Sequence, residues 1–138
     1  MQVVGLVRKY IDSSRFWKIS LEEQKEILSK LLHDICQLYG IEGVSLVVDI
    51  NSAMYRVTGG GCYVPSERKI YLYKISVMTF LHEVGHLILG QDEWKVMMWS
   101  HKVFFLSFPD LYLKNVQKGR FLHAVSLQEL EKFNEGIK

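Results

Sequence analysis

Two histidines four residues apart, with a glutamate directly after the first, are the residues of this chain best suited to chemistry. They are His82, Glu83 and His86, within the stretch TFLHEVGHLILGQDEW, residues 79–94. On an α-helix with 3.6 residues per turn, side chains four apart lie one above the other, so both imidazoles can reach one ion. Neutral imidazole binds zinc, and a carboxylate beside the ion can take a proton from the water that zinc acidifies. The spacing therefore indicates a metal site with Glu83 as general base.

The opposite face of the same helix favours a place in a folded core. Counting about 100° per residue, the apolar residues gather away from the histidines; they are Val77, Phe80, Leu81, Val84 and Ile88. Ser76 is the expected N-cap of this helix, which extends to Leu89. A chance match to the motif on a solvated helix would lack this apolar face, so we favour the metal-binding interpretation.

A catalytic zinc site needs a third protein ligand, and the sequence offers Glu93, with Asp92 as the alternative. If one helix ran unbroken from His82 to Glu93, these residues would lie about 16 Å apart along its axis. A turn is therefore required, and Gly90 can supply it because glycine tolerates the left-handed conformation. Asp92 is the expected N-cap of a second helix, running towards Leu106, and this role competes with metal binding. We therefore prefer Glu93.

Other histidines and tyrosines are weaker candidates. His101, two turns along the second helix, is the next possible ligand, although a lone histidine among apolar residues is more often a core or surface residue. His33 has no motif around it. The nearby candidates for stabilising an oxyanion are Tyr55, Tyr63, Tyr71, Tyr73, His101 and His123. Most of the tyrosines are expected to pack on strands.

The rest of the chain predicts a small sheet and further helices. A helix over residues 20–39 has capping-box spacing between Ser20 and Glu23, and Gly40 follows its end. Strands are expected over residues 44–50 and 53–57, followed by a hairpin of residues 62–64 and 69–73 around the turn PSER. Pro109 is expected to close the second motif helix, and residues 126–133 to form a short helix.

Composition bounds the class of protein. The 138 residues, 49% hydrophobic and 23% charged, predict one globular domain, 1–138, of the α+β class. A net charge of +2, with scattered basic residues, gives no sign of nucleic-acid binding. Cys36 and Cys62 are expected to be buried thiols. The first residues lack the long apolar region of a secretory signal, and no stretch predicts a membrane span, so a cytoplasmic location is favoured.

Between residues 55 and 105 the chain resembles a minimal zincin of the gluzincin type. The resemblance lies in the glycine-rich turn, the hairpin GCYVPSERKIYLY, the helix TFLHEVGHLILG and the following DEWKVMMW. Small zincins of the ImmA/IrrE kind, common in regulators of phage and other mobile elements, are similar in placing a hairpin before an HExGH helix. The resemblance implies a zincin-like fold, Zn²⁺ bound by His82, His86 and Glu93, and Glu83 as general base. It also implies that the strand before the motif helix forms a substrate-binding edge.

The chain departs from the patterns of both related groups. In many ImmA/IrrE-type domains the third ligand lies farther downstream, whereas Glu93 follows His86 by seven positions. In the metzincin pattern HExxHxxGxxH the glycine comes one place earlier than Gly90, and Asp92 stands at the third-ligand position. Asp92 therefore stays open as the alternative ligand.

The leading functional prediction is a zinc metallopeptidase in which zinc-bound water, activated by Glu83, attacks a peptide or protein substrate laid along residues 69–73. A regulatory protease of a mobile element is one role consistent with the resemblance. The alternative is a catalytically silent zincin-like domain that uses zinc for stability and binds a partner protein through Trp94, Trp99 and Phe105. A small-molecule amidase would use the same metal chemistry.

Overall fold

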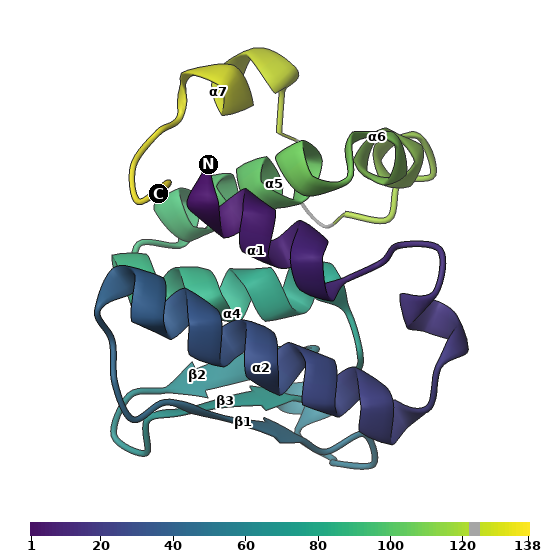
Figure 1. Ribbon diagram of the computed structural model, residues 1–138, viewed down its shortest axis with the longest axis vertical. Coiled ribbons are helices and arrows are strands. Elements are labelled where there is room, and N and C mark those ends of the chain that lie inside the picture. The colour runs from purple at the N-terminus through teal and green to yellow at the C-terminus, as the bar shows by residue number, and fades with distance from the viewer. Residues whose placement is uncertain (122–124) are drawn as a thin grey trace.

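The computed structural model describes residues 1–121 and 125–138, in which helices are layered on one face of a small sheet (Figure 1). Helices α2 (Leu21–Tyr39) and α4 (Val77–Leu89) cover the sheet, and α1 (Gln2–Tyr10) and α5 (Glu93–Ser107) lie above them. Of the shorter helices, α6 (Pro109–Gln117) lies beside the end of α5, and α7 (Leu127–Lys132) lies above α5. A 3₁₀ turn, Phe16–Lys18, links α1 to α2. The predicted α+β class is confirmed.

The sheet has the strand order β1-β3-β2, with β1 at Ser45–Val48, β2 at Gly61–Val64 and β3 at Lys69–Leu72. β1 runs parallel to β3, and β2 forms the predicted antiparallel hairpin with it. Tyr71 of β3 therefore faces Val47 on one side and Cys62 on the other. The prediction that residues 69–73 offer a free edge to a substrate is wrong, because β3 is the central strand. Within the described residues β2 is the edge strand of the hairpin.

The segment expected to form a strand over residues 53–57 is instead a turn followed by the short helix α3 (Tyr55–Thr58). Local side-chain hydrogen bonds explain the difference. The Ser52 hydroxyl accepts from the Met54 N–H at 3.1 Å, and the Thr58 hydroxyl donates to the Met54 carbonyl at 3.0 Å. Such bonds give the backbone partners that a strand would have to find in a neighbouring chain segment. The strand predicted over 44–50 is also shorter, since it ends at Val48.

Helix starts agree with the sequence signals. The predicted caps of α2, α4 and α5 each accept a hydrogen bond from the N–H three residues later; they are Ser20, Ser76 and Asp92. Ser126, predicted as the first residue of a short helix, is instead the N-cap of α7 and accepts from the Glu129 N–H. Helices α1 and α6 were not predicted. Pro109 does not simply end α5 but begins α6, where a proline loses no helical hydrogen bond.

The motif helix α4 lies at the centre of the core, between the sheet and α5. Four residues of its predicted apolar face, Val77, Phe80, Leu81 and Val84, are at most 3% exposed, whereas Ile88 is only partly buried. Phe80, Leu81 and Val84 share one cluster with Ile70 and Leu72 of β3 and with Trp99 and Val103 of α5. Because α4 is buried on two sides, its remaining face, which carries His82 and His86, has a fixed direction.

Two further predictions concern the cysteines and the membrane. Cys36 is buried and Cys62 is half-buried, and both are free thiols. In the part of the chain that the structure describes, every helix is too short or too polar to cross a membrane.

Candidate metal centre

Three side chains from α4 and α5 converge on one point. One ligand atom each from His82, His86 and Glu93 lies within 4.8 Å of the others. The Glu93 carboxylate is 3.1 Å from Nε2 of His82 and 2.9 Å from Nε2 of His86. The His86 side chain is 10% exposed and the Glu93 side chain 70% exposed. The cluster therefore faces solvent on the Glu93 side.

The turn between α4 and α5 brings Glu93 back to the histidines. Gly90 ends α4 with φ +82° and ψ −142°, a conformation that is almost confined to glycine. It differs from the left-handed helical conformation expected from the sequence, but it has the same physical basis, the absence of a Cβ. α5 then begins at Glu93, so its first residue lies beside the motif rather than two turns beyond it.

A second glycine sets the spacing between the two helices. A Cβ on Gly85 would lie 3.0 Å from Cγ1 of Val96 and 3.4 Å from the Val96 carbonyl oxygen. A Cβ at this position would require Val96 or α5 to shift by a few tenths of an ångström, so glycine lets the two helices approach this closely without such a shift. The residue before His86 in the motif therefore controls how far the Glu93 side chain has to reach.

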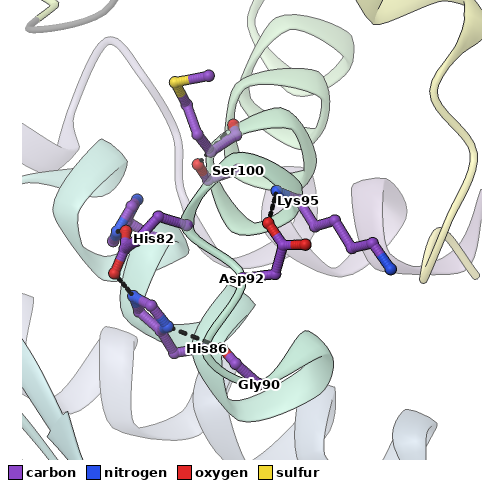
Figure 2. Close-up of polar contacts among 8 residues, drawn as sticks. His82, His86, Gly90, Asp92, Lys95 and Ser100 are labelled. Atoms are coloured by element: carbon purple, nitrogen blue, oxygen red, sulfur yellow. Dashed lines mark hydrogen bonds and ion pairs between the residues drawn. The ribbon is translucent and has the colours of Figure 1, made fainter.

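The orientation of His86 is fixed by a backbone carbonyl. Its Nδ1 lies 2.8 Å from the carbonyl oxygen of Gly90 (Figure 2). Because a carbonyl only accepts, Nδ1 carries the proton, and in the neutral ring Nε2 is left with the lone pair that binds a metal. Metal-binding histidines are commonly oriented by such a bond on the other ring nitrogen.

Asp92 has a different task. Its Oδ1 accepts from the Lys95 N–H at 3.1 Å, and Figure 2 shows its carboxylate turned towards the backbone of Lys95 and away from His82 and His86. This is the N-cap role expected from the sequence. The geometry brings Glu93, not Asp92, to the histidines, and metal binding by Glu93 stays a prediction.

Glu83 is buried next to this cluster. The residue is 6% exposed. Burial, which disfavours the charged form, raises the pKa of its carboxyl group, and the nearby Glu93 raises it further. His86 and a backbone hydrogen bond from Tyr63 act in the opposite direction and lower that pKa. A carboxyl group with a raised pKa beside possible metal ligands is suited to receiving and returning a proton.

A cavity of about 750 Å³ extends from the cluster along α4. One side is formed by Thr58, the Gly59–Gly61 turn, Cys62 and Tyr63, and the other by α5, α6 and Phe121. Of the proposed oxyanion-stabilising residues, Tyr63 and His101 line this cavity, whereas Tyr55, Tyr71 and Tyr73 do not. His123 lies outside the described residues.

His101 contributes to the cavity wall and is not in the metal cluster. It is 5% exposed, and its Nδ1 is 2.9 Å from the hydroxyl of Tyr112. Burial raises the pKa of that hydroxyl to about 12, so it stays protonated and can donate. Aromatic contacts with Tyr112 and Phe121 hold the imidazole in place.

Sequence reasoning missed several residues that line the cavity. Trp17 reaches it from the turn between α1 and α2, and Lys74, Asn115 and Arg120 line it as well. None of these residues stands in a motif, and tertiary packing brings them to the site from distant parts of the chain. The one local signal was the glycine run at residues 59–61, which is typical of a close approach of backbone to a neighbour.

Comparisons with known proteins found no relative. No family model matches the chain, and no curated protein or solved structure is similar to it at a significant level.

Proposed function

We propose that this protein is a zinc-dependent metallopeptidase. The observation that carries the proposal is the position of buried Glu83 beside the His82, His86 and Glu93 cluster, in the wall of a large cavity. A histidine–glutamate cluster formed only for stability would need neither a buried carboxyl group nor a cavity. This combination favours catalysis over a purely structural role.

The donor set fits zinc. Catalytic zinc sites commonly use three protein ligands, two histidines and a glutamate among the known sets, and leave one position open. Donors bound about 2.1 Å from a tetrahedral ion lie about 3.4 Å from one another. The present separations of 2.9 and 3.1 Å between Glu93 and the two imidazoles are close to that value. Small side-chain movements would therefore suffice to bind the ion.

The residues of the chain have distinct tasks in this proposal. Zinc, when bound, would supply a Lewis acid that polarises a carbonyl group and acidifies water. Glu83 would accept the proton of the attacking water and pass it to the leaving amine. Burial of Glu83 keeps bulk water from competing for its carboxyl group, and the Tyr63 backbone hydrogen bond holds that group at the cavity wall.

The substrate favoured by the geometry is an extended peptide. β1 and β2 are the two edge strands of the described sheet, and Gly61, Cys62 and Tyr63 of β2 line the cavity. Extended peptides add to such an edge through backbone hydrogen bonds, and side-chain pockets then give specificity. A peptide along β2 would pass Glu83, because Tyr63 belongs to β2 and its backbone is hydrogen-bonded to the Glu83 carboxyl group.

The partner-binding alternative loses its expected contact surface. Trp99 is completely buried and Phe105 is half-buried, so Trp94, 56% exposed, is the one prominently exposed aromatic of the three. An aromatic patch made by all three residues is therefore absent from the described surface. A silent domain would have to bind through another face.

The test is metal content and peptide cleavage by the full chain and by Glu83→Gln. Wild type is expected to bind one equivalent of Zn²⁺ and to cleave members of a peptide library, with cleavage lost on chelation. Glu83→Gln should keep the zinc and lose cleavage by at least about 100-fold, as expected for removal of a general base. Zinc-loaded wild type that cleaves no peptide, or a glutamine variant that cleaves as fast, would overturn the proposal.

A further inference from the structure

The cavity continues well beyond the metal cluster, towards the start of α4. On one side it is lined there by Lys74 and Ser76, just before that helix. On the other side are Phe104, near the end of α5, and Phe121, whose ring centroids lie 5.9 Å apart. Because α4 and α5 are joined by a short turn and pack antiparallel (Figure 1), the end of α5 lies beside the start of α4. We call this part of the cavity the distal end.

The charge of the distal end is positive. The charged residues that line the whole cavity, histidines aside, are Lys74, Glu83, Glu93 and Arg120. Both glutamates belong to the proposed centre. Within the described residues, no carboxylate lies within 4.0 Å of the Lys74 amine or the Arg120 guanidinium group, since the ion pairs found there join other side chains. Both distal cations are therefore available to an anionic ligand.

Lys74 is exposed, and its side chain packs against Gly60. A Cβ on Gly60 would lie 2.5 Å from Cε and 3.2 Å from Cγ of Lys74, so the lysine chain occupies the space that the glycine leaves free. Its Nζ also lies 5.9 Å from the centroid of the Tyr55 ring. A lysine packed in this way has lost part of the side-chain freedom that normally weakens an exposed ion pair. The absence of a side chain at Gly60 thus leaves room for Lys74 beside the cavity.

Arg120 has a similar support. One of its terminal nitrogens donates to the Asn115 side chain at 3.4 Å, and Asn115 also lines the cavity. Its neighbour Phe121 contacts Phe104, His101 and Tyr112 through ring edges and faces. The aromatic cluster thereby places the arginine at the cavity rather than on a separate surface.

From these observations we infer that the substrate class is acidic: the cavity takes a peptide with aspartate or glutamate side chains at the distal end. The inference rests on the proposed peptidase function. Ser76 precedes His82 by six residues, which is about 9 Å along the helix axis. An extended peptide covers about 3.3 Å per residue, so the acidic side chain would stand about three residues from the cleaved bond.

Cleavage-site mapping provides the first test. Zinc-loaded full chain digests a mixed peptide library, and mass spectrometry identifies the cleaved bonds. Aspartate and glutamate should be enriched about threefold to fivefold two to four residues from the bond, on one side only, as expected for partly exposed ion pairs. The enrichment should shrink in high salt, which screens such pairs. In the double variant Lys74→Glu and Arg120→Glu it should disappear or give way to lysine and arginine.

A matched control removes the effect of net charge. The double variant Lys69→Glu and Lys118→Glu carries the same charge change, but neither residue lines the cavity. It should keep the acidic preference of wild type. An equal loss of preference in the control and the cavity variant would show that overall charge, not the distal end, selects the substrate, and would overturn the inference.

A binding measurement separates this inference from the proposed function. The probes are fluorescein-labelled peptides of glycine, alanine and threonine that differ only in carrying two aspartates or two asparagines, added to the Glu83→Gln variant. Tighter binding of the aspartate peptide supports the inference even if wild type cleaves nothing, in which case only the peptidase proposal fails. Cleavage without any acidic preference overturns the inference and leaves the peptidase standing. Absence of both binding and cleavage overturns both.

Discussion

Nδ1 of His86 lies 2.8 Å from the carbonyl oxygen of Gly90, so the residue that turns the chain between α4 and α5 also orients a proposed metal ligand. The two roles reinforce each other. The positive φ of Gly90 directs α5 back along α4, and the same residue's carbonyl fixes the proton of His86 on Nδ1, which leaves Nε2 for the proposed metal. The site therefore depends on a glycine that touches no ion.

Gly90→Val should weaken zinc binding. A β-branched residue at φ +82° and ψ −142° is strained, so the turn is expected to change and to move both the carbonyl and Glu93. We expect about tenfold to 100-fold weaker Zn²⁺ binding, the range typical of disturbed outer-shell partners, measured by competition with a chelating dye. Gly40→Val is the control, since Gly40 also has a positive φ and open space around it but lies at the end of α2. Equal zinc affinity in both variants would contradict the role assigned to Gly90.

Glu93 and Asp92 should be separable by what their loss affects. Glu93→Gln is expected to lower Zn²⁺ affinity by more than about 100-fold, because a direct ligand outweighs an outer-shell partner. Asp92→Ala should instead lower the free energy of unfolding by about 1 kcal/mol through loss of the α5 cap, with zinc affinity changed only a few-fold. Isothermal titration and thermal melts measure the two effects. The reverse pattern would assign the ligand to Asp92.

Gly85→Ala should disturb the centre through helix packing. The added Cβ would meet Val96 Cγ1 at 3.0 Å, and α5 would have to move away from α4. The expected results are a loss of about 1–3 kcal/mol in stability, as for other overpacked sites, and a measurable loss of zinc affinity. Adding Val96→Ala removes the nearest atom and should restore most of that affinity.

The control for Gly85→Ala is Gly5→Ala. Gly5 is also a helix glycine, but an added Cβ meets nothing within 4 Å, so this change should leave zinc affinity unaltered and raise stability slightly. If the Gly85 variant bound zinc as well as wild type, close approach of the two helices would not be a requirement of the site.

Lys102 should matter for stability but not for the centre. This lysine is 5% exposed, and its amine donates to the carbonyls of Glu131 and Phe133 and to the Asn134 side chain. Lys102→Met leaves these acceptors without a partner and is expected to cost about 2 kcal/mol or more. Lys95→Met, which removes an exposed ion pair with Glu135, should cost less than about 1 kcal/mol. Urea denaturation measures both, and equal costs would contradict the role of Lys102.

Some of the missed elements had readable signals. Val3 and Val7, four residues apart and both completely buried, are the inward face of α1, and Arg8 and Lys9 suit the end of a helix. This segment is short, so its helical periodicity is a weaker signal than that of α2 or α4. The segment at residues 53–57 has no comparable sequence signal. There the hydrogen bonds of two hydroxyl groups, those of Ser52 and Thr58, favour a turn and a short helix over a strand.

The sequence by itself determined the local parts of this protein. The caps Ser20, Ser76 and Asp92 were readable because each hydrogen bond spans three residues. The common face of His82 and His86 was readable because helix periodicity is the same wherever a helix lies. Even the need for a turn at Gly90 follows from the length of a helix alone.

Only the tertiary structure decided which groups come together from a distance. β3 became the central strand when Ser45 paired with Lys69, and this left β2, not β3, as the edge beside Glu83. Lys74 and Arg120 line the same cavity because α6 and Phe121 return over the end of α5. Such pairings depend on the balance of burial over the whole chain, and no short stretch of sequence records that balance.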